Sequence, residues 1–226
     1  MQKTRLAVLL SLALAGSSLA GSLVGSLAWA QEPAAAPVPK GDAARGAVLS
    51  DTCMGCHGIA SYRNAYPSYR VPKLGGQHPE YIVIALQGYK NLTRPHKTMH
   101  AQAISLSDQA MLDIATFFAS EGGLQKAASL AGTPPEKAAT CVACHGEGGI
   151  SVAATWPSLA GQHKDYLEHA LNEYKNGLRE DAIMGSQAIN LKPEEIRELA
   201  AYFASQSGLF SVHYAIAGRA TAAAGK

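Results

Sequence analysis

The sequence predicts an all-α protein made of two small tandem domains, and three observations lead to this fold class. The first is a repeat: from Gln77 onward the second half follows the first at a constant offset of 85, so that Gln162 matches Gln77 and Phe203 matches Phe118. The second is the helical spacing of apolar residues in both halves. The third is that no useful stretch alternates polar and apolar residues, as a half-buried strand would.

Caps, prolines and apolar stripes place the helices. Pro79 can occupy the first turn of one helix, Ser107 and Asp108 can cap the start of another, and Gly122 and Gly123 can stop it. Between these two helices we expect a loop, 92–105. The expected helices run from about Asp42 into Cys53, from Pro79 to about Asn91, from about Asp108 to Ser120, from Pro134 into Cys141 and from Pro193 to Ser205.

Both halves contain the pentad Cys-x-x-Cys-His, and the two copies use all four cysteines of the chain. On a helical turn, residues three and four apart share a face. Cys53 and Cys56 can therefore present their sulfurs to the two vinyl groups along one edge of a porphyrin, while His57 lies beneath the ring and binds the iron. The second copy repeats this arrangement with Cys141, Cys144 and His145. The pattern predicts two covalently bound haem c groups.

Such cysteine pairs have three other uses: a structural zinc site, a thioredoxin-like redox pair and a disulfide. Zinc ribbons place their second pair about 15–20 residues after the first, whereas Cys141 follows Cys53 by 88 positions. A redox Cys-x-x-Cys belongs near a βαβ pattern, and none is visible. Haem attachment is favoured because each motif also lies inside a longer repeat.

The sixth iron ligand decides what a haem site does. A strong protein ligand completes the coordination of the iron, and such a haem transfers electrons, whereas a haem with an open position binds small molecules. Met99 and Met184 occupy the same place in the two repeats, and a thioether sulfur is a suitable soft ligand. We predict His57 and Met99 on one iron, and His145 and Met184 on the other. Two alternatives stay open: the methionines fill core space, or a second histidine (His78, His163) is the ligand.

A ligating histidine usually donates its other N–H to a fixed acceptor. The carbonyls of Pro72 and Pro157 are the candidates, because proline makes the loop rigid on the proximal side. Arg94 and Arg179 are predicted to pair with haem propionates. Aromatic residues that can pack on the haem rings are Tyr89, Tyr174 and Trp156.

Residues 1–30 have the pattern of a secretion signal. Lys3 and Arg5 form the basic start, Leu6 to Ala15 the apolar stretch, and Ala28-Trp29-Ala30 a cleavage site. Cleavage after Ala20 is an alternative, and so is an uncleaved anchor, because Leu6 to Ala30 carries no charge and is long enough to span a bilayer. Removal of the signal lowers the formal charge from +2 to zero, which argues against a nucleic-acid partner.

The rest of the chain divides at changes in composition and at the restart of the repeat. Because c-type haem is attached outside the bacterial cytoplasm, the periplasm is the expected compartment. The expected segments are a Pro/Ala spacer at 31–40, a first domain at 41–121, a linker at 122–133, a second domain at 134–208 and a tail at 209–226, of which Leu209, Phe210 and Tyr214 are expected to pack on the core.

These motifs, in this order in both halves, resemble the di-haem cytochrome c4 family over about Gly41 to Gly208. After each Cys-x-x-Cys-His come Pro-x-Leu-x-Gly-Gln, a helix with tyrosines, an arginine, a methionine and a last helix ending in aromatic-Phe-Ala-Ser. The resemblance implies two class I cytochrome c domains with haems close together and His/Met ligation. It also implies electron transfer from a quinol-cytochrome c reductase or a dehydrogenase to a terminal oxidase or reductase, with loose membrane attachment in some members.

Three features depart from the family pattern: a longer Tyr-rich loop from Gly58 to Val71, the Met99-His100 pair and the tail. The first two bear on the surroundings of the first haem. We therefore expect a periplasmic electron carrier and no enzyme. Two rival functions stay open: an electron-outlet subunit of a dehydrogenase complex, and a di-haem peroxidase in which one iron opens its sixth position.

Overall fold

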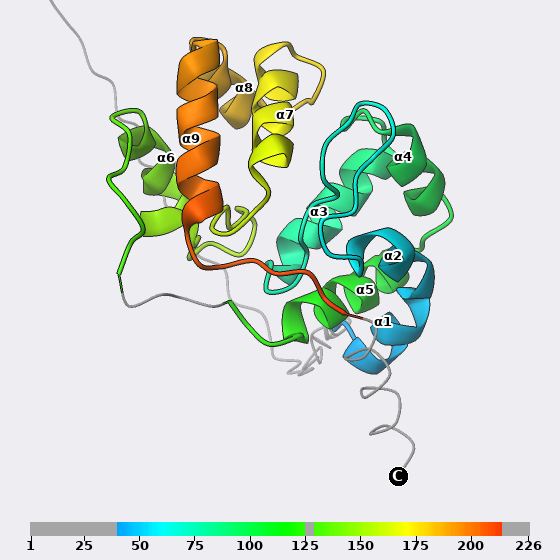
Figure 1. Cartoon of the computed structure of the whole chain (residues 1–226). Coiled ribbons are helices and arrows are strands. Elements are labelled where there is room, and N and C mark those ends of the chain that lie inside the picture. The colour runs from blue at the N-terminus through cyan, green and yellow to red at the C-terminus, as the bar shows by residue number, and fades with distance from the viewer. Residues whose placement is uncertain (1–39, 125–128, 214–226) are drawn as a thin grey trace, which may run out of the picture. The chain divides into compact units, whose positions relative to one another are not determined.

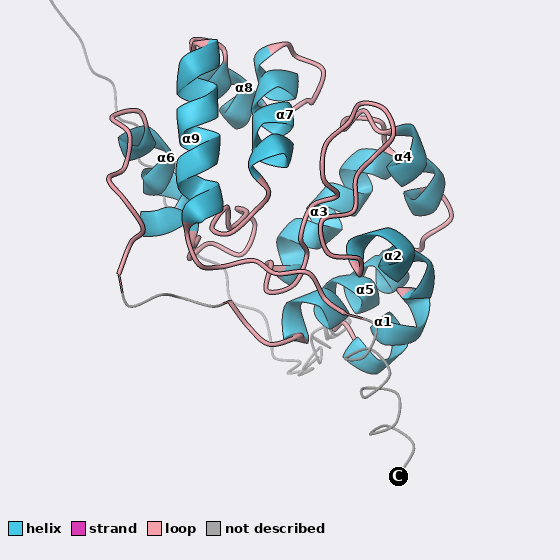
Figure 2. Ribbon diagram, viewed as in Figure 1, coloured by secondary structure: helices cyan, strands magenta, loops and turns pink. Residues whose placement is uncertain are grey.

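The computed structural model describes residues 40–124 and 129–213, and in this part of the chain it contains helices, loops and two isolated β-bridges but no strand (Figures 1 and 2). The predicted signal, the spacer before Lys40, Tyr214 and the rest of the tail lie outside the described residues. The helices are α1 (Ala43–Leu49), α2 (Asp51–His57), α3 (Pro79–Lys90), α4 (Lys97–Ala103), α5 (Asp108–Ser120), α6 (Ala138–His145), the 3-10 turn η1 (Glu147–Gly149), α7 (Lys164–Lys175), α8 (Ala182–Ala188) and α9 (Pro193–Ser205).

The all-α prediction is therefore confirmed for the described residues. Among them, no helix has both the length and the apolar character needed to cross a membrane.

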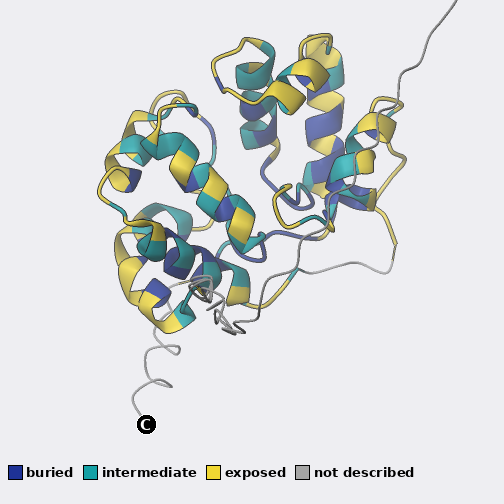
Figure 3. Ribbon diagram, turned by 180° about the vertical axis from the view of Figure 1, so that it is seen from behind, coloured by how far each residue is buried: buried dark blue, intermediate teal, exposed yellow. Residues whose placement is uncertain are grey.

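In the first half, α5 is the central helix, and both α1 and α3 pack against it. Its apolar stripe falls on one face, and Phe117 and Phe118 are almost fully buried there. Gly46 lets α1 come close to α5, because a Cβ at this position would lie 1.9 Å from the carbonyl oxygen of Asp113. Figure 3 shows buried and exposed positions on different faces of the helices, as expected of helices that cover a core.

In the second half, α9 takes the place of α5. α7 packs against α9, and α8 packs against α7. The buried core here is smaller and centres on Leu199 and Phe203 of α9 and on Leu167 of α7. The order α3, α4, α5 of the first half thus returns as α7, α8, α9 in the second, as the repeat predicts.

Three sequence predictions were wrong at helix boundaries. The helix expected from Pro134 into Cys141 is α6, which begins at Ala138 and runs on to His145. The single helix expected from Asp42 into Cys53 is two helices, because Ser50 ends α1 and begins α2 with backbone angles outside the helical range (φ −84°, ψ 1°). The first haem-binding motif lies on the second of these. The loop expected at 92–105 contains α4, and its counterpart in the second half contains α8.

Caps explain these two short helices. His96 precedes α4, and its Nδ1 accepts a hydrogen bond from the backbone N–H of Met99 (3.1 Å). Asp181 precedes α8, and its Oδ1 accepts from the N–H of Met184 (2.8 Å). A side-chain acceptor at this place satisfies a free N–H of the first turn. Both methionines therefore lie on short capped helices and not in loops.

The segment after α9 packs as expected at Leu209, which is buried, and it then reaches the first half. Gly75 and Phe210 exchange two backbone hydrogen bonds (3.0 and 3.2 Å). The Phe210 ring packs against the core of the first half, and Val212 is a fully buried member of that core. The end of the second half therefore completes the core of the first.

A buried carboxylate joins α1 to α5. Asp113 on α5 is only 2% exposed. It accepts hydrogen bonds from the backbone N–H of Asp42 (2.8 Å), from Nε and Nη2 of Arg45 (2.8 and 2.9 Å) and from Nε2 of Gln109 (2.9 Å). The hydrogen bonds from Arg45 lower the pKa of this carboxyl below its usual range.

We expect Asp113→Asn to lower the free energy of unfolding by about 2 kcal/mol at neutral pH, because an amide has one acceptor oxygen in place of two and cannot accept from all four N–H groups as the carboxylate does. The pKa of Asp113 is depressed in the folded state, so its contribution is complete above the unfolded value of about 3.9 and is lost as pH falls through the folded pKa. Urea unfolding of both proteins from pH 7 to pH 3 measures this. A difference that stays constant over that range would contradict it.

Candidate functional site

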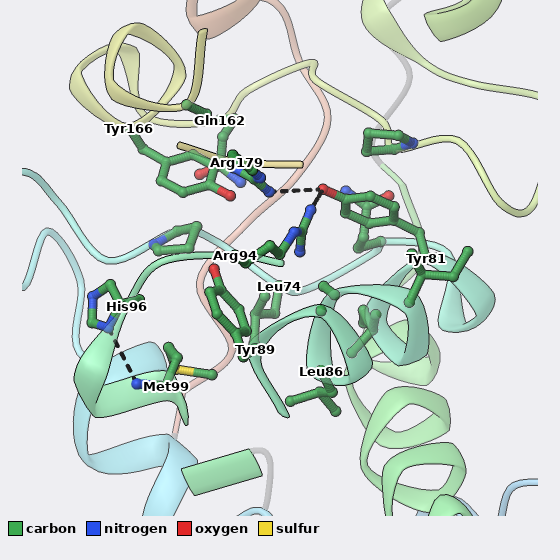
Figure 4. Close-up of a pocket in the computed structure, with 18 of the residues that line it drawn as sticks. Leu74, Tyr81, Leu86, Tyr89, Arg94, His96, Met99, Gln162, Tyr166 and Arg179 are labelled. Atoms are coloured by element: carbon green, nitrogen blue, oxygen red, sulfur yellow. Dashed lines mark hydrogen bonds between the residues drawn. The ribbon is translucent and has the colours of Figure 1, made fainter. Parts of the chain in front are cut away.

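The motifs that both repeats contain line one cavity of about 380 Å³. Its walls come from both halves and are largely apolar. They include both cysteine pairs, both motif histidines and both candidate methionines. Figure 4 shows part of this cavity, with α3 and α4 of the first half facing residues of the second. The eight residues predicted to attach haem and ligate iron are therefore brought to one continuous space: Cys53, Cys56, His57, Met99, Cys141, Cys144, His145 and Met184.

The two motif histidines are held in the same way. His57 ends α2, and its Nδ1 donates to the carbonyl oxygen of Pro72 at 2.8 Å. His145 ends α6, and its Nδ1 donates to the carbonyl oxygen of Pro157, also at 2.8 Å. Burial lowers the pKa of both rings, so both are neutral imidazoles. Each ring keeps Nε2 available, and neutral imidazole is the form that ligates iron.

The four cysteines are free, so no disulfide joins them. Burial raises the pKa of the thiols of Cys53 and Cys141, which opposes the thiolate that a redox pair or a zinc site needs. Within the described residues, no three His, Cys, Asp or Glu side chains are grouped to hold a metal ion. The geometry thus favours haem attachment over the three alternatives.

Met99 and Met184 line the cavity from α4 and α8. The cap at the start of each helix fixes the backbone at the methionine itself, and Figure 4 shows this bond between His96 and Met99. Burial lowers the pKa of His96, which keeps the ring neutral and able to accept. Ligation of iron by the two methionines stays a prediction.

The competing histidines lie elsewhere. His78 and His163 directly precede α3 and α7 without a side-chain cap hydrogen bond, and neither is among the residues that line the cavity. Nε2 of His78 is 2.8 Å from the carbonyl oxygen of Ser151 in the second half. His100, next to Met99, also lies off the cavity wall, with its Nδ1 2.9 Å from the carbonyl oxygen of Tyr89.

Two arginines from different halves meet in the cavity. Arg94 and Arg179 are 7% and 4% exposed. Nη2 of Arg94 donates to the hydroxyl of Tyr81 at 2.6 Å, and Nη2 of Arg179 lies 3.5 Å from the same oxygen. Figure 4 shows both guanidinium groups directed at Tyr81. The Arg179 guanidinium also lies over the ring of Tyr174, 4.8 Å from its centroid.

The surroundings of these two arginines bear on whether haem fits the cavity. Neither has a carboxylate partner among residues 40–124 and 129–213, and Nε of Arg179 has no hydrogen-bond acceptor. Buried charges are normally paired, so this arrangement calls for an anionic guest. Haem carries two propionates on an otherwise apolar ring, which matches an apolar cavity containing two unpaired guanidinium groups and two free imidazole nitrogens.

Sequence reasoning missed three residues of this site. The sequence prediction for this site did not include Tyr81, and it did not identify His96 and Asp181 as caps. The last two occupy matched places in the repeat but differ in type, so a search for identical residues passes over them. A search for any side-chain acceptor three residues before each methionine would have found both.

Comparisons with known proteins agree with this geometry. The cytochrome c family model matches residues 137–207. Cytochrome c4 of Thiocapsa roseopersicina is 40% identical over 185 residues, which cover 75% of this chain and 94% of that protein. A "thiosulfate dehydrogenase electron acceptor" of Stutzerimonas stutzeri is 31% identical, with 68% of this chain and 78% of that protein covered.

The fold is also similar to a solved structure. Reduced recombinant cytochrome c4 from Pseudomonas stutzeri superposes with a TM-score of 0.59 at 28% identity, over 74% of this chain and 99% of that one. Together with the two Cys-x-x-Cys-His motifs, these similarities establish two covalently bound haem c groups in the chain.

We expect Arg179→Gln to lower a haem reduction potential by tens of millivolts. Removing a buried positive charge favours the more positive ferric state over the ferrous state. A spectroelectrochemical titration of the whole protein measures the shift. Arg63→Gln is the control, because the Arg63 side chain is 50% exposed and makes its ion pair with Asp165 outside the cavity lining. Equal potentials in the Arg179 variant and the wild type would contradict a role beside the haem propionates.

Proposed function

Because the chain belongs to the cytochrome c4 family, we propose that it carries electrons through two closed haem sites, one ligated by His57 and Met99 and the other by His145 and Met184. The coarser statement, that it is a di-haem electron carrier, follows from the family itself. One observation carries the finer proposal. In each repeat, a neutral imidazole with a free Nε2 and a methionine on a capped helix line the same cavity.

Such a site suits electron transfer because it does not change its ligands. The haem supplies a centre that gains or loses one electron. The protein has to hold both axial side chains in place during that change. The Pro72 and Pro157 carbonyls fix the histidines, and the caps of α4 and α8 fix the backbone at the methionines. Rigid second-sphere contacts of this kind keep ligand positions and tune the metal.

The expected compartment is the periplasm, since covalent attachment of haem c occurs outside the bacterial cytoplasm and residues 1–30 read as a secretion signal. The redox partners are proteins. We propose a quinol-cytochrome c reductase or a dehydrogenase as donor and a terminal oxidase or reductase as acceptor, with loose membrane attachment. No nucleic-acid partner is proposed, because the formal charge of +2 falls to zero without Lys3 and Arg5.

A second candidate is an electron-outlet subunit of a dehydrogenase complex. It is favoured by the relative that is named as the electron acceptor of thiosulfate dehydrogenase. Co-purification of this chain with a dehydrogenase would distinguish this role from that of a free carrier. The peroxidase rival requires an iron with an open sixth position, and neither His100 nor His78 lies on the cavity wall to exchange with Met99.

We expect the oxidised protein to show the far-red band of a methionine sulfur on ferric haem at an intensity that corresponds to two haems. Met99→Leu should remove half of that intensity and Met184→Leu the other half, because leucine has no sulfur to donate. Met111→Leu is the matched control: Met111 is fully buried on α5, away from the cavity lining, and this swap conserves volume. Half intensity in the wild type would overturn His/Met ligation at one iron.

A further inference from the structure

Two buried glutamines are not explained by the haem site itself. Gln77 and Gln162 occupy matched positions in the repeats, each between a glycine and a histidine. Both are only 5% exposed. A buried primary amide must find partners for its donor and its acceptor, so the partners of these side chains show what they do.

Each glutamine binds the backbone of the other half. Gln77 Nε2 donates to the carbonyl oxygen of Ser158 at 3.0 Å, and Gln77 Oε1 accepts from the N–H of Ser158 at 2.9 Å. Gln162 Nε2 donates to the carbonyl oxygen of Lys73 at 3.0 Å, and Gln162 Oε1 accepts from the N–H of Lys73 at 2.9 Å. Lys73 and Ser158 are themselves matched repeat positions. The contact is therefore reciprocal.

The partner residues follow directly on the prolines that orient the motif histidines. Ser158 is next to Pro157, whose carbonyl accepts from His145, and Lys73 is next to Pro72, whose carbonyl accepts from His57. The peptide unit that contains the Pro157 carbonyl also contains the N–H of Ser158. Gln77 therefore holds the same peptide group that holds His145. Gln162 does the same for His57.

Both amides are themselves held in place. Gln77 Oε1 also accepts from the N–H of His78 (3.1 Å), and Gln162 Oε1 accepts from the N–H of His163 (3.0 Å). These N–H groups stand at the starts of α3 and α7. Each helix start thus fixes a glutamine that reaches into the opposite half. A side chain without an amide would leave a buried backbone N–H and C=O of that half unsatisfied, which is costly.

We propose that Gln77 and Gln162 are crossed positioning residues, and that each sets the orientation of the axial histidine in the half to which it does not belong. This rests on the proposed ligation of iron by His57 and His145. Neither glutamine touches a histidine ring; each acts through one peptide group. The two haem sites of the intact chain are consequently not independent, because each proximal hydrogen bond is supported from the other half.

The test follows the Nδ1–H protons of His57 and His145 in the reduced, haem-loaded, full-length protein by NMR. Exchange of such a buried proton with solvent requires local opening. In Gln77→Leu, exchange at His145 should become about tenfold faster, the factor expected from the loss of one or two buried hydrogen bonds, while exchange at His57 is unchanged. In Gln162→Leu the pattern should be reversed. Gln87→Leu, an exposed position on α3, should change neither.

A second readout is the reduction potential. A weaker hydrogen bond to the proline carbonyl makes the imidazole a poorer electron donor, so the potential of the haem in the opposite half should rise. Faster exchange in the glutamine's own half, equal acceleration in both halves, or no change would each overturn the proposal, since simple adhesion between the halves predicts no crossed pattern.

If the leucine variants do not mature, Gln77→Glu and Gln162→Glu are used, because glutamate keeps the acceptor and loses the donor. The same crossed pattern is expected and the same results would overturn it. The NMR spectrum of the wild type distinguishes a failure of this proposal from a failure of the proposed iron ligation. If the two Nδ1–H signals lack the ring-current shifts of iron-bound imidazole in the wild type, the ligation is wrong, whereas shifted signals without a crossed response leave ligation intact and reject the crossed positioning.

Discussion

The hydrogen bond from a neutral imidazole to a proline carbonyl is the contact on which this structure depends. It leaves Nε2 of the ring free, and it holds the ring in one orientation only if the carbonyl itself is fixed. In both halves the carbonyl lies in an irregular loop between two helices, so its position is set by contacts from outside the loop. The helices around it provide walls, and the amides of Gln77 and Gln162 provide the fixed partners for the neighbouring peptide groups.

The second constraint is electrostatic. Arg94 and Arg179 come from different halves and are buried near one tyrosine hydroxyl, and neither forms an ion pair with a carboxylate of the described residues. Two like charges so placed would destabilise the interface unless anions join them. We propose that haem propionates supply that charge, so that attachment of the cofactors and docking of the halves stabilise each other. The apolar walls of the cavity and the two guanidinium groups inside it therefore suit the same cofactor.

The two repeats have diverged where the halves meet. The long loop of the first half reaches α7: the Tyr69 ring stacks on His169 with centroids 4.2 Å apart, and Arg63 pairs with Asp165 at 3.1 Å. The segment after α9 returns in the other direction and places Val212 in the first core. Among residues 40–124 and 129–213, neither contact has a counterpart in the other repeat. They hold together two halves that each have only a small core.

The sequence by itself determined what depends on local spacing. It predicted the all-α class, the tandem repeat, both haem motifs, the last helix of each half and the two proline acceptors, since each needs only residues three or four apart or a repeated order. It failed at the helix break at Ser50, which depends on the backbone angles of one residue, and at α4 and α8, which depend on the caps His96 and Asp181. Only the tertiary structure decided which residues form hydrogen bonds between the two halves. Gln77 and Ser158 are 81 positions apart, and a hydrogen bond over that distance leaves no local pattern, because the fold alone brings its partners together.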